Sequence, residues 1–228
     1  GTTAEAVRKT ERLLVVGRNS YIGSYFTQYA QARGASVTAL SSADCNFLER
    51  SEVDRLFRSL GSEPSTIIFL ATVNKDVANT YQSFLENVQM IKHLIDGQQH
   101  ACVNSILYFS AADVYGCSPQ VPLTEDAPVS PESWYSLGKA AGDWMLQHAE
   151  ELRCPVTILR IPGIYGQAPR DRSLIGRLVS EARATGQVTI HGEGTSLRDY
   201  VSLNDLCDRP PRVLEDGSGA VLDESGDA

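Results

Sequence analysis

Tyr135 and Lys139 stand four residues apart in a stretch whose apolar spacing predicts a helix. On a helix this spacing places both side chains on one face. A phenol ionises at about pH 10, and a neighbouring ammonium lowers that pKa because it favours the phenolate. The pair therefore predicts a catalytic tyrosine that exchanges a proton with a hydroxyl or carbonyl group. A surface pair without chemistry is the alternative, and the position of the pair after residues 110–116 disfavours it.

A turn with two glycines follows the first apolar run, residues 12–16, and leads into a helical pattern. A dinucleotide pyrophosphate needs such a tight turn, a close approach of the backbone and a free helix N-terminus. Ser20 replaces the middle glycine of the usual pattern. The predicted cofactor contacts in this turn are Gly17, Arg18, Ser20, Tyr21, Ile22 and Gly23. A strand-to-helix turn without a ligand is the alternative interpretation.

The second predicted strand ends at Leu40, where many dinucleotide binders carry an acid that bonds the adenosine ribose. Ser41 and Ser42 follow it here, and Arg18 could pair with a 2′-phosphate. The predicted cofactor is therefore NAD or NADP, with NADP slightly favoured. Ser41, Asp44 and Ala71 are assigned to the cofactor site as well. Asp44 could instead cap a turn, and Arg18 could be a solvated surface residue.

Apolar runs alternate with helical patterns along the chain. Such alternation predicts an α/β fold, a Rossmann-type doubly wound parallel sheet with helices on both faces. The predicted strands cover residues 12–16, 37–40, 66–70, 106–109 and 156–160. The predicted helices run from residue 22 to a stop at 34 and over 51–60, 81–95 and 134–152.

The pattern changes after about residue 166. A helix is expected over 173–184 and a short strand over 188–191, followed by an acidic, turn-rich stretch over 208–228. We therefore expect a dinucleotide-binding domain over 1–168. Residues 169–228 would form a small, incomplete C-terminal substrate-binding portion, from which some segments return to the sheet.

The composition disfavours several classes of partner. A net charge of -8 is unsuited to binding nucleic acid or an anionic membrane. No apolar run is long enough to span a bilayer, and residues 1–11 carry no secretion signal. The five cysteines are odd in number and never at Cys-x-x-Cys spacing, so neither a metal site nor a disulfide framework is expected. A cytoplasmic location fits these features.

Five elements in order resemble the extended short-chain dehydrogenase/reductase family, also called the NAD-dependent epimerase/dehydratase family, which acts on nucleotide sugars. They are the glycine turn, the strand and Val-Tyr-Gly segment at 106–116, the Tyr135/Lys139 pair, the Leu-Arg to Tyr-Gly stretch at 159–166, and residues 192–201 followed by Asp205.

The resemblance implies an epimerase or reductase that moves a hydride between NAD(P) and a nucleotide sugar. Tyr135 would be the acid/base, and Lys139 would lower its pKa and hold the nicotinamide ribose. Arg198 would approach the substrate diphosphate, although a structural ion pair with Asp199 is the alternative. Asp113 lies where sugar dehydratases of the family carry an acid, so it is assigned to the substrate. Relatives also suggest a homodimer through the helices over 81–95 and 134–152.

The family's Ser or Thr donor falls on Ala111. Ser110 is therefore the candidate, but neighbours on a strand point to opposite faces, so it serves only if the strand has ended or twisted there. Loss of one such hydrogen bond costs on the order of 10²-fold in rate. A catalytically weak or inactive nucleotide-binding protein is accordingly the alternative function. Ala112 replaces a dehydratase Asp, which argues against that reaction. A flavodoxin-like protein would leave Tyr135 and Lys139 unexplained.

Overall fold

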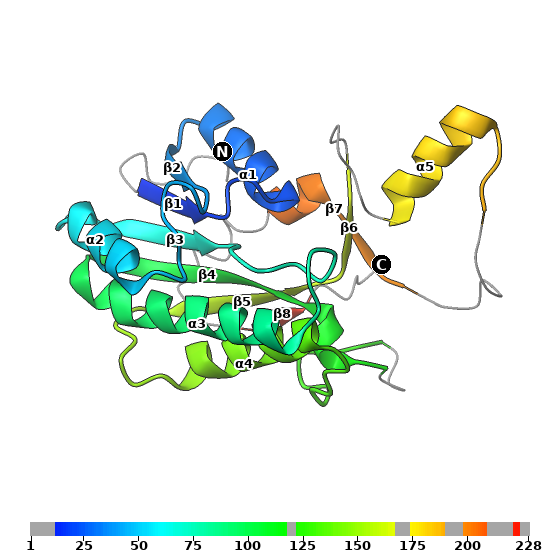
Figure 1. Ribbon diagram of the computed structural model, residues 1–228. Coiled ribbons are helices and arrows are strands. Elements are labelled where there is room, and N and C mark those ends of the chain that lie inside the picture. The colour runs from blue at the N-terminus through cyan, green and yellow to red at the C-terminus, as the bar shows by residue number, and fades with distance from the viewer. Residues whose placement is uncertain (1–11, 118–121, 167–173, 190–197, 209–220, 224–228) are drawn as a thin grey trace.

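The computed structural model describes residues 12–117, 122–166, 174–189, 198–208 and 221–223 (Figure 1). A parallel sheet of six strands, in the order β2-β1-β3-β4-β5-β8, forms its centre. The strands are β1 (Arg12–Val16), β2 (Ser36–Leu40), β3 (Ser65–Phe69), β4 (Val103–Ala111), β5 (Val156–Ile161) and β8 (Val221–Asp223). The predicted fold class, an α/β Rossmann-type sheet, is confirmed.

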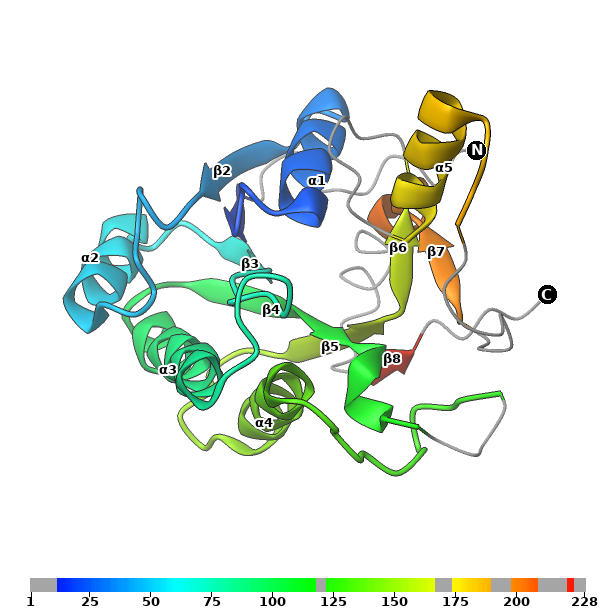
Figure 2. The same cartoon turned by 45° about the vertical axis from the view of Figure 1, so that its right-hand side comes forward.

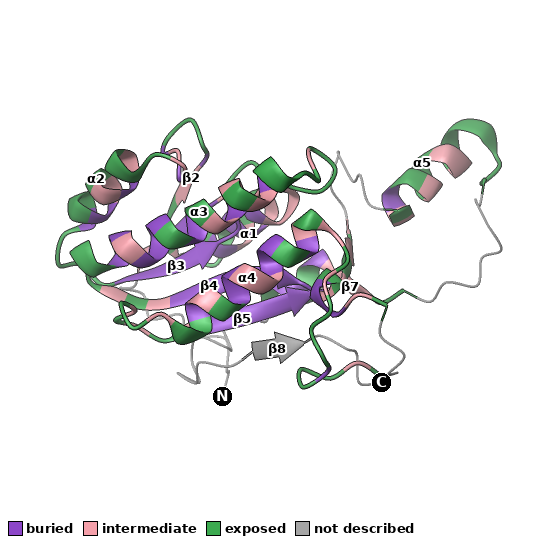
Figure 3. Cartoon of the chain, turned by 60° about the horizontal axis from the view of Figure 1, so that its bottom comes forward, coloured by how far each residue is buried: buried purple, intermediate pink, exposed green. Residues whose placement is uncertain are grey.

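Helices cover both faces of this sheet because its strands are apolar on both sides. One face packs on α2 (Arg50–Leu60), α3 (Tyr81–Gly97) and α4 (Trp134–His148). The other face packs on α1 (Tyr21–Ala32) and on a helical segment over residues 203–208. The buried colouring of the strands between the helices shows these two cores (Figure 3). No helix among the described residues is long and apolar enough to cross a membrane.

Serine and threonine residues fix where α3 and α4 begin. Thr80 and Ser133 each accept a hydrogen bond from a backbone N–H three residues later, and the serine at that position bonds back to the cap. Such capping boxes satisfy backbone donors that have no partner within the helix. The predicted end of α4 at residue 152 is wrong: the helix ends at His148 because Ala149 is already extended, on the way back to β5.

One portion of the chain after residue 162 lies to one side of the main sheet, whereas residues 203–208 and β8 return to it (Figures 1 and 2). It contains the two-stranded parallel pair β6 (Gly163–Tyr165) and β7 (Tyr200–Ser202) and the helix α5 (Leu174–Thr185), close to the predicted helix. The predicted strand over 188–191 is wrong for residues 188 and 189, which have no regular structure, and its other two residues lie outside the described part. The division into two domains stays a prediction.

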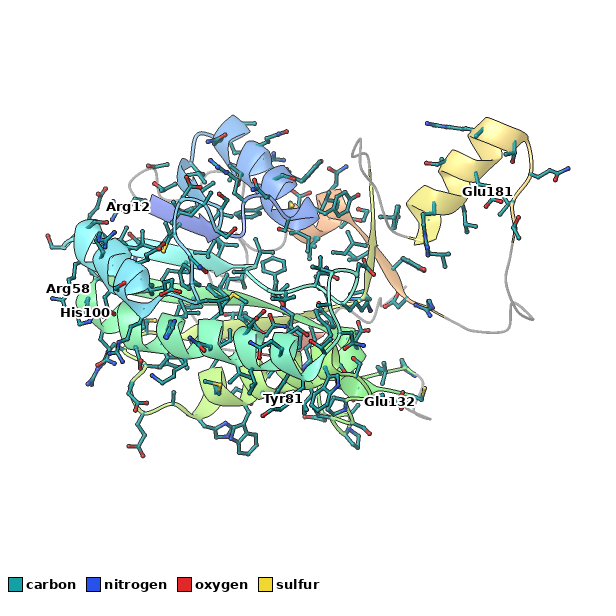
Figure 4. All side chains as sticks on the ribbon, viewed as in Figure 1. Arg12, Arg58, Tyr81, His100, Glu132 and Glu181 are labelled. Carbon is teal, nitrogen blue, oxygen red and sulfur yellow. The ribbon has the colours of Figure 1, made fainter. Side chains whose placement is uncertain are left out.

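Two short helices flank β4, and they help to show at which end of the sheet the strands finish. The 3₁₀ helices are η1 (Gln98–His100) and η2 (Ala112–Tyr115), which flank β4 on either side. Arg12, Arg58 and His100 lie toward the end of the sheet where strands begin, whereas Tyr81 and Glu132 lie toward the opposite end (Figure 4). The carboxyl ends of the strands, where open α/β sheets bind ligands, are therefore on the side of η2 and the start of α4.

Candidate cofactor and catalytic site

The turn between β1 and α1 leaves no room for a side chain at its two glycine positions, Gly17 and Gly23. Gly17 has a φ of +109°, and a Cβ there would lie 3.0 Å from Leu70 Cβ and 3.1 Å from the Ala71 nitrogen. A Cβ on Gly23 would lie 2.2 Å from the Gly17 oxygen. The backbone of the turn therefore packs tightly against the end of β3. These contacts within the protein hold the N-terminus of α1 close to the carboxyl end of β1, which is where a pyrophosphate lies in folds of this type.

Ser20 supports this turn through its hydroxyl group. Its Oγ donates to the Gly17 carbonyl at 2.7 Å and accepts from the Gly23 N–H at 3.0 Å. Ser20 is thus the N-cap of α1 as well as the residue in the middle glycine position. The side chain that departs from the glycine pattern closes the turn from within.

A carboxylate stands at the end of β2, contrary to the prediction from Ser41 and Ser42. Asp44 Oδ2 accepts from the Ser41 N–H at 2.8 Å and from the Ser41 hydroxyl at 2.7 Å, and it pairs with Arg18 at 3.1 Å. The two hydrogen bonds and the Arg18 guanidinium lower the pKa of Asp44. The prediction was wrong because the chain turns after Leu40 and brings Asp44 back onto Ser41. This geometry removes the argument for NADP.

Lys139 reaches from α4 to the carboxyl end of β4. Its Nζ donates to the Phe109 carbonyl at 2.6 Å and lies 5.9 Å from the centroid of the Tyr135 ring. The side chain is buried, and burial lowers the pKa of Lys139 to about 8, against an opposing effect of Asp143. Tyr135 and Lys139 therefore share one helix face as predicted, directed at the sheet.

The pKa of Tyr135 moves in the direction opposite to the prediction. Burial raises it, and the carboxylates of Asp113 and Asp76 raise it further. Burial outweighs the effect of Lys139 on this pKa. Loss of hydration destabilises the phenolate more than an ammonium several ångströms away stabilises it.

The loop between β3 and α3 covers this region and is held by amide side chains. Asn87 Oδ1 accepts from the Val73 N–H at 2.6 Å, and Asn79 Oδ1 accepts from the Tyr135 N–H at 3.0 Å. Ala71, at the start of the loop, adjoins Gly17. Lys75, in the middle of it, donates to Asp113 Oδ1 at 2.6 Å and lies 5.6 Å from the centroid of the Tyr135 ring. The loop thus runs from the glycine turn to Tyr135.

Ser110 does not meet the condition that the sequence set for it. β4 continues through Ala111, and Ser110 is paired in register with Arg160 of β5. Its side chain is buried beside Asp143, whose pKa burial raises while Ser110 and Arg160 oppose that rise. Among the described residues, Ser110 Oγ and Asp143 Oδ1 are both buried without a hydrogen-bond partner. The assignment of Ser110 as a proton donor stays a prediction without geometric support.

A buried ion pair that the sequence analysis did not foresee lies one helical turn from Lys139. Arg160 Nε donates to Asp143 Oδ2 at 2.9 Å, and Arg160 Nη1 donates to the Tyr115 hydroxyl at 2.9 Å. The pair joins β5, α4 and η2. An arginine inside an apolar strand was the signal, because such a charge needs a buried partner.

Arg198 belongs to the C-terminal portion of the chain. It is exposed just before β7, and Asp199 Oδ1 accepts from the Tyr200 N–H at 2.8 Å. The contact of Arg198 with a substrate diphosphate stays a prediction. Among the described residues, no three or more His, Cys, Asp or Glu side chains are grouped to hold a metal ion.

The fold and the glycine turn define a Rossmann-type nucleotide-binding protein. The chain belongs to the NAD dependent epimerase/dehydratase family, whose model matches residues 13–221. This confirms the resemblance drawn from the five sequence elements.

Relatives of known activity fall into more than one reaction class. The chain is 30% identical over 224 residues to UDP-glucose 4-epimerase of Mycolicibacterium smegmatis, covering 86% of this chain and 71% of that protein. It is 24% identical over 246 residues to dTDP-4-dehydro-6-deoxy-D-allose reductase of Streptomyces bikiniensis, covering 94% of this chain and 76% of that protein.

Two solved structures share the fold. UDP-glucose 4-epimerase of Thermotoga maritima, solved with UDP-glucose, matches with a TM-score of 0.81 at 22% identity, over 93% of this chain and 76% of that one. The dTDP-glucose 4,6-dehydratase DesIV of Streptomyces venezuelae, in a double mutant solved with NAD, matches with a TM-score of 0.79 at 24% identity, over 93% and 74%.

Proposed function

We propose that this protein is an NAD-dependent enzyme that epimerises or reduces the sugar of a nucleotide sugar. The observation that carries the proposal is the arrangement at the carboxyl ends of the strands. A tight turn in which Gly17 and Gly23 leave no room for a Cβ suits a pyrophosphate, and a half-buried tyrosine and a buried lysine follow on the same edge of the sheet. Family membership supports the same activity.

The residues divide the work as follows. The turn from Gly17 to Gly23 and the start of α1 would hold the pyrophosphate, and Ala71 would lie against the dinucleotide. A bound nicotinamide accepts or supplies the hydride. Tyr135 would give a proton to the sugar oxygen or take one from it, and Lys139 would favour the phenolate. Because the pKa of Tyr135 is raised by burial, the proton-donating form predominates at neutral pH.

Substitution of Tyr135 by phenylalanine tests this proposal. In NAD-loaded protein given UDP-glucose or dTDP-glucose, or in NADH-loaded protein given a 4-keto nucleotide sugar, turnover should fall by roughly 10²- to 10⁴-fold, while the Kd for NAD stays the same. Tyr81→Phe is the matched control, since Tyr81 is an exposed phenol at the start of α3. Equal turnover of both variants would refute Tyr135 as the acid/base.

NAD rather than NADP is our proposal for the cofactor. Asp44 would accept hydrogen bonds from the adenosine ribose and repel a 2′-phosphate. Arg18 is already paired with Asp44 and so is not free to bind that phosphate. Calorimetric titration should give a lower Kd for NAD than for NADP. Asp44→Ala should reduce the ratio of the two Kd values by about 10-fold or more, because it removes the repulsion and frees Arg18. Preferred binding of NADP by the unsubstituted protein would contradict this.

A nucleotide-binding protein without catalysis is the second candidate, favoured by Ala111 in place of the expected hydroxyl. It predicts tight NAD binding and no turnover of any of the sugars above. It also predicts that Tyr135→Phe changes nothing measurable.

We also propose a homodimer formed by α3 and α4. These two helices pack on each other, and their outer surfaces expose large apolar side chains: Tyr81, Leu85, Trp134, Leu137 and Trp144. Light scattering after size exclusion should give twice the chain mass, and Trp144→Glu should reduce it to one chain. A monomeric unsubstituted protein would refute the proposal.

A further inference from the structure

Lys75 is a charged side chain at the catalytic pair for which the sequence analysis found no role. It lies in the loop between β3 and α3, with its ammonium 2.6 Å from Asp113 Oδ1 and 5.6 Å from the centroid of the Tyr135 ring. We propose that Lys75 is a second catalytic residue, an ammonium that donates to the reacting sugar oxygen across from Tyr135 while Asp113 holds it in place. This inference rests on the function proposed above.

The position of Lys75 is fixed from three elements. Asn87 of α3 bonds the loop backbone on one side of it, through the N–H and the carbonyl of Val73 at 2.6 and 3.2 Å. Asn79 on the other side accepts from the N–H of Tyr135 in α4. The partner Asp113 belongs to η2, directly after β4. The loop is therefore anchored by α3 and α4, and η2 supplies the partner of the ammonium.

The ion pair leaves donors for a ligand. A lysine ammonium carries three N–H donors, and Asp113 takes one of them. Both side chains are about half exposed, so the other two donors remain accessible to a substrate. Exposed ion pairs contribute little to folding stability. The folded state therefore has little need of this pair.

The charges around Tyr135 explain what the Lys75 ammonium would do at this site. Lys139, the other cation near the ring, is buried and donates to the Phe109 carbonyl. Asp113 and Asp76 place negative charge near the phenol and raise its pKa. Lys75 offsets the charge of Asp113 and would stabilise negative charge that develops on the sugar oxygen. It could also supply the hydrogen bond that Ala111 cannot make.

Four substitutions, the last of them made in two backgrounds, test this role in NAD-loaded protein, with the nucleotide sugar that the unsubstituted protein turns over. Lys75→Met should lower kcat on the order of 10²-fold with an unchanged Kd for NAD. Lys75→Arg should retain most of the activity because it keeps the charge. Asp113→Asn, which frees the ammonium, should give an intermediate loss. Ala111→Ser should raise kcat more in the Lys75→Met background than in the unsubstituted protein.

A second readout separates this role from a structural one. Without Lys75 the charge of Asp113 is no longer offset, so the pKa of Tyr135 should rise, and any limb of the kcat profile that depends on the phenolate should move to higher pH. Besides Lys75, the ionisable groups near this phenol among the described residues are Asp113, Asp76, Lys139 and Tyr108.

Lys92→Met is the matched control, because Lys92 forms an ion pair of the same length, 2.6 Å, with Asp96 on the surface of α3. Lys92→Met should match the unsubstituted protein in kcat. If Lys75→Met also matches it, Lys75 has no catalytic role and the proposed function stands. If the unsubstituted protein binds NAD and turns over no nucleotide sugar, the proposed function and this inference fail together.

Discussion

The glycine turn and the β4–α4 region, that is β4, α4 and the adjacent β5, are built from different parts of the chain. The turn works mainly through its backbone, and the side chain that supports it, Ser20, is bonded to atoms three residues away in either direction. The β4–α4 region works through buried charges, Lys139, Asp143 and Arg160, which come from two elements. A backbone site follows from local spacing, whereas a charged site depends on which elements pack together.

Breaking the buried ion pair should have the largest effect on stability. Asp143→Asn leaves the Arg160 guanidinium buried without its counter-charge, so the free energy of unfolding should fall by about 3–5 kcal/mol. Urea titration followed by circular dichroism measures it. The matched control is Asp208→Asn in the exposed pair with Arg33, where the loss should be under about 1 kcal/mol.

A double substitution sharpens the same point. Asp143→Leu together with Arg160→Met removes both charges and should recover most of the stability, because replacement of a whole buried pair by apolar groups is often neutral. If Asp143→Asn costs no more than Asp208→Asn, the β4–α4 region does not depend on its buried charges as described.

Filling the cradle should abolish NAD binding while the catalytic region stays folded. Gly23→Ala places a Cβ 2.2 Å from the Gly17 oxygen, so the Kd for NAD should rise by about 100-fold or more as the turn is forced apart. Gly34→Ala is the control: its φ of +82° makes alanine strained, but nothing lies within 4 Å of the added Cβ. NAD affinity that survives Gly23→Ala would place the dinucleotide elsewhere.

The pH dependence of stability tests the buried ammonium of Lys139. Burial lowers the pKa of its folded form from 10.5 to about 8. Below about pH 8, Lys139 is protonated in both states, and its buried charge lowers the stability of the folded state. Between pH 8 and 10.5 the unfolded chain binds more protons than the folded one, so this destabilisation is lost as the pH rises. Lys139→Met removes this contribution.

A comparison of the unsubstituted protein with Lys139→Met isolates the effect of Lys139 on the pH dependence of stability. The unfolding free energy of the unsubstituted protein, minus that of Lys139→Met, should rise with pH over this interval by at most about 1.4 kcal/mol per pH unit. Matched urea titrations at pH 8, 9 and 10 measure it. A difference that is flat or falls would mean that Lys139 is not destabilised by burial.

The sequence predicted the parts of this molecule that local patterns encode. Five strands, the cradle and the shared face of Tyr135 and Lys139 follow from periodicity and spacing, and they needed no knowledge of the tertiary fold. The contact of Lys75 with Asp113 joins residues 38 positions apart, and that of Arg160 with Asp143 joins residues 17 apart. No local pattern brings such residues together, so their roles emerged only from the packed structure.

Two errors at the site have the same physical origin. The end of β2 was predicted to carry no carboxylate, but a turn closed by the Asp44 N–H and the Ser41 carbonyl at 3.0 Å carries Asp44 back to it. The pKa of Tyr135 was predicted to fall from the charge of its neighbour alone, but burial decides its direction. Turn conformation and burial depth are both results of folding, and residue type alone does not determine them.

The smallest effect is expected at Ser20, where the backbone site relies on a side chain. Ser20→Ala removes the cap of α1, so the free energy of unfolding should fall by about 0.5–2 kcal/mol, whereas Ser20→Gly should cost only a few tenths. Ser20→Gly also restores the usual glycine pattern. If the hydroxyl serves the turn alone, the Kd for NAD should change less than about threefold in Ser20→Gly, a free-energy change under about 0.7 kcal/mol. A loss of NAD affinity much larger than the loss of stability would instead show that the hydroxyl itself contacts the dinucleotide, and the division between a backbone site and a charged site would have to be redrawn at this residue.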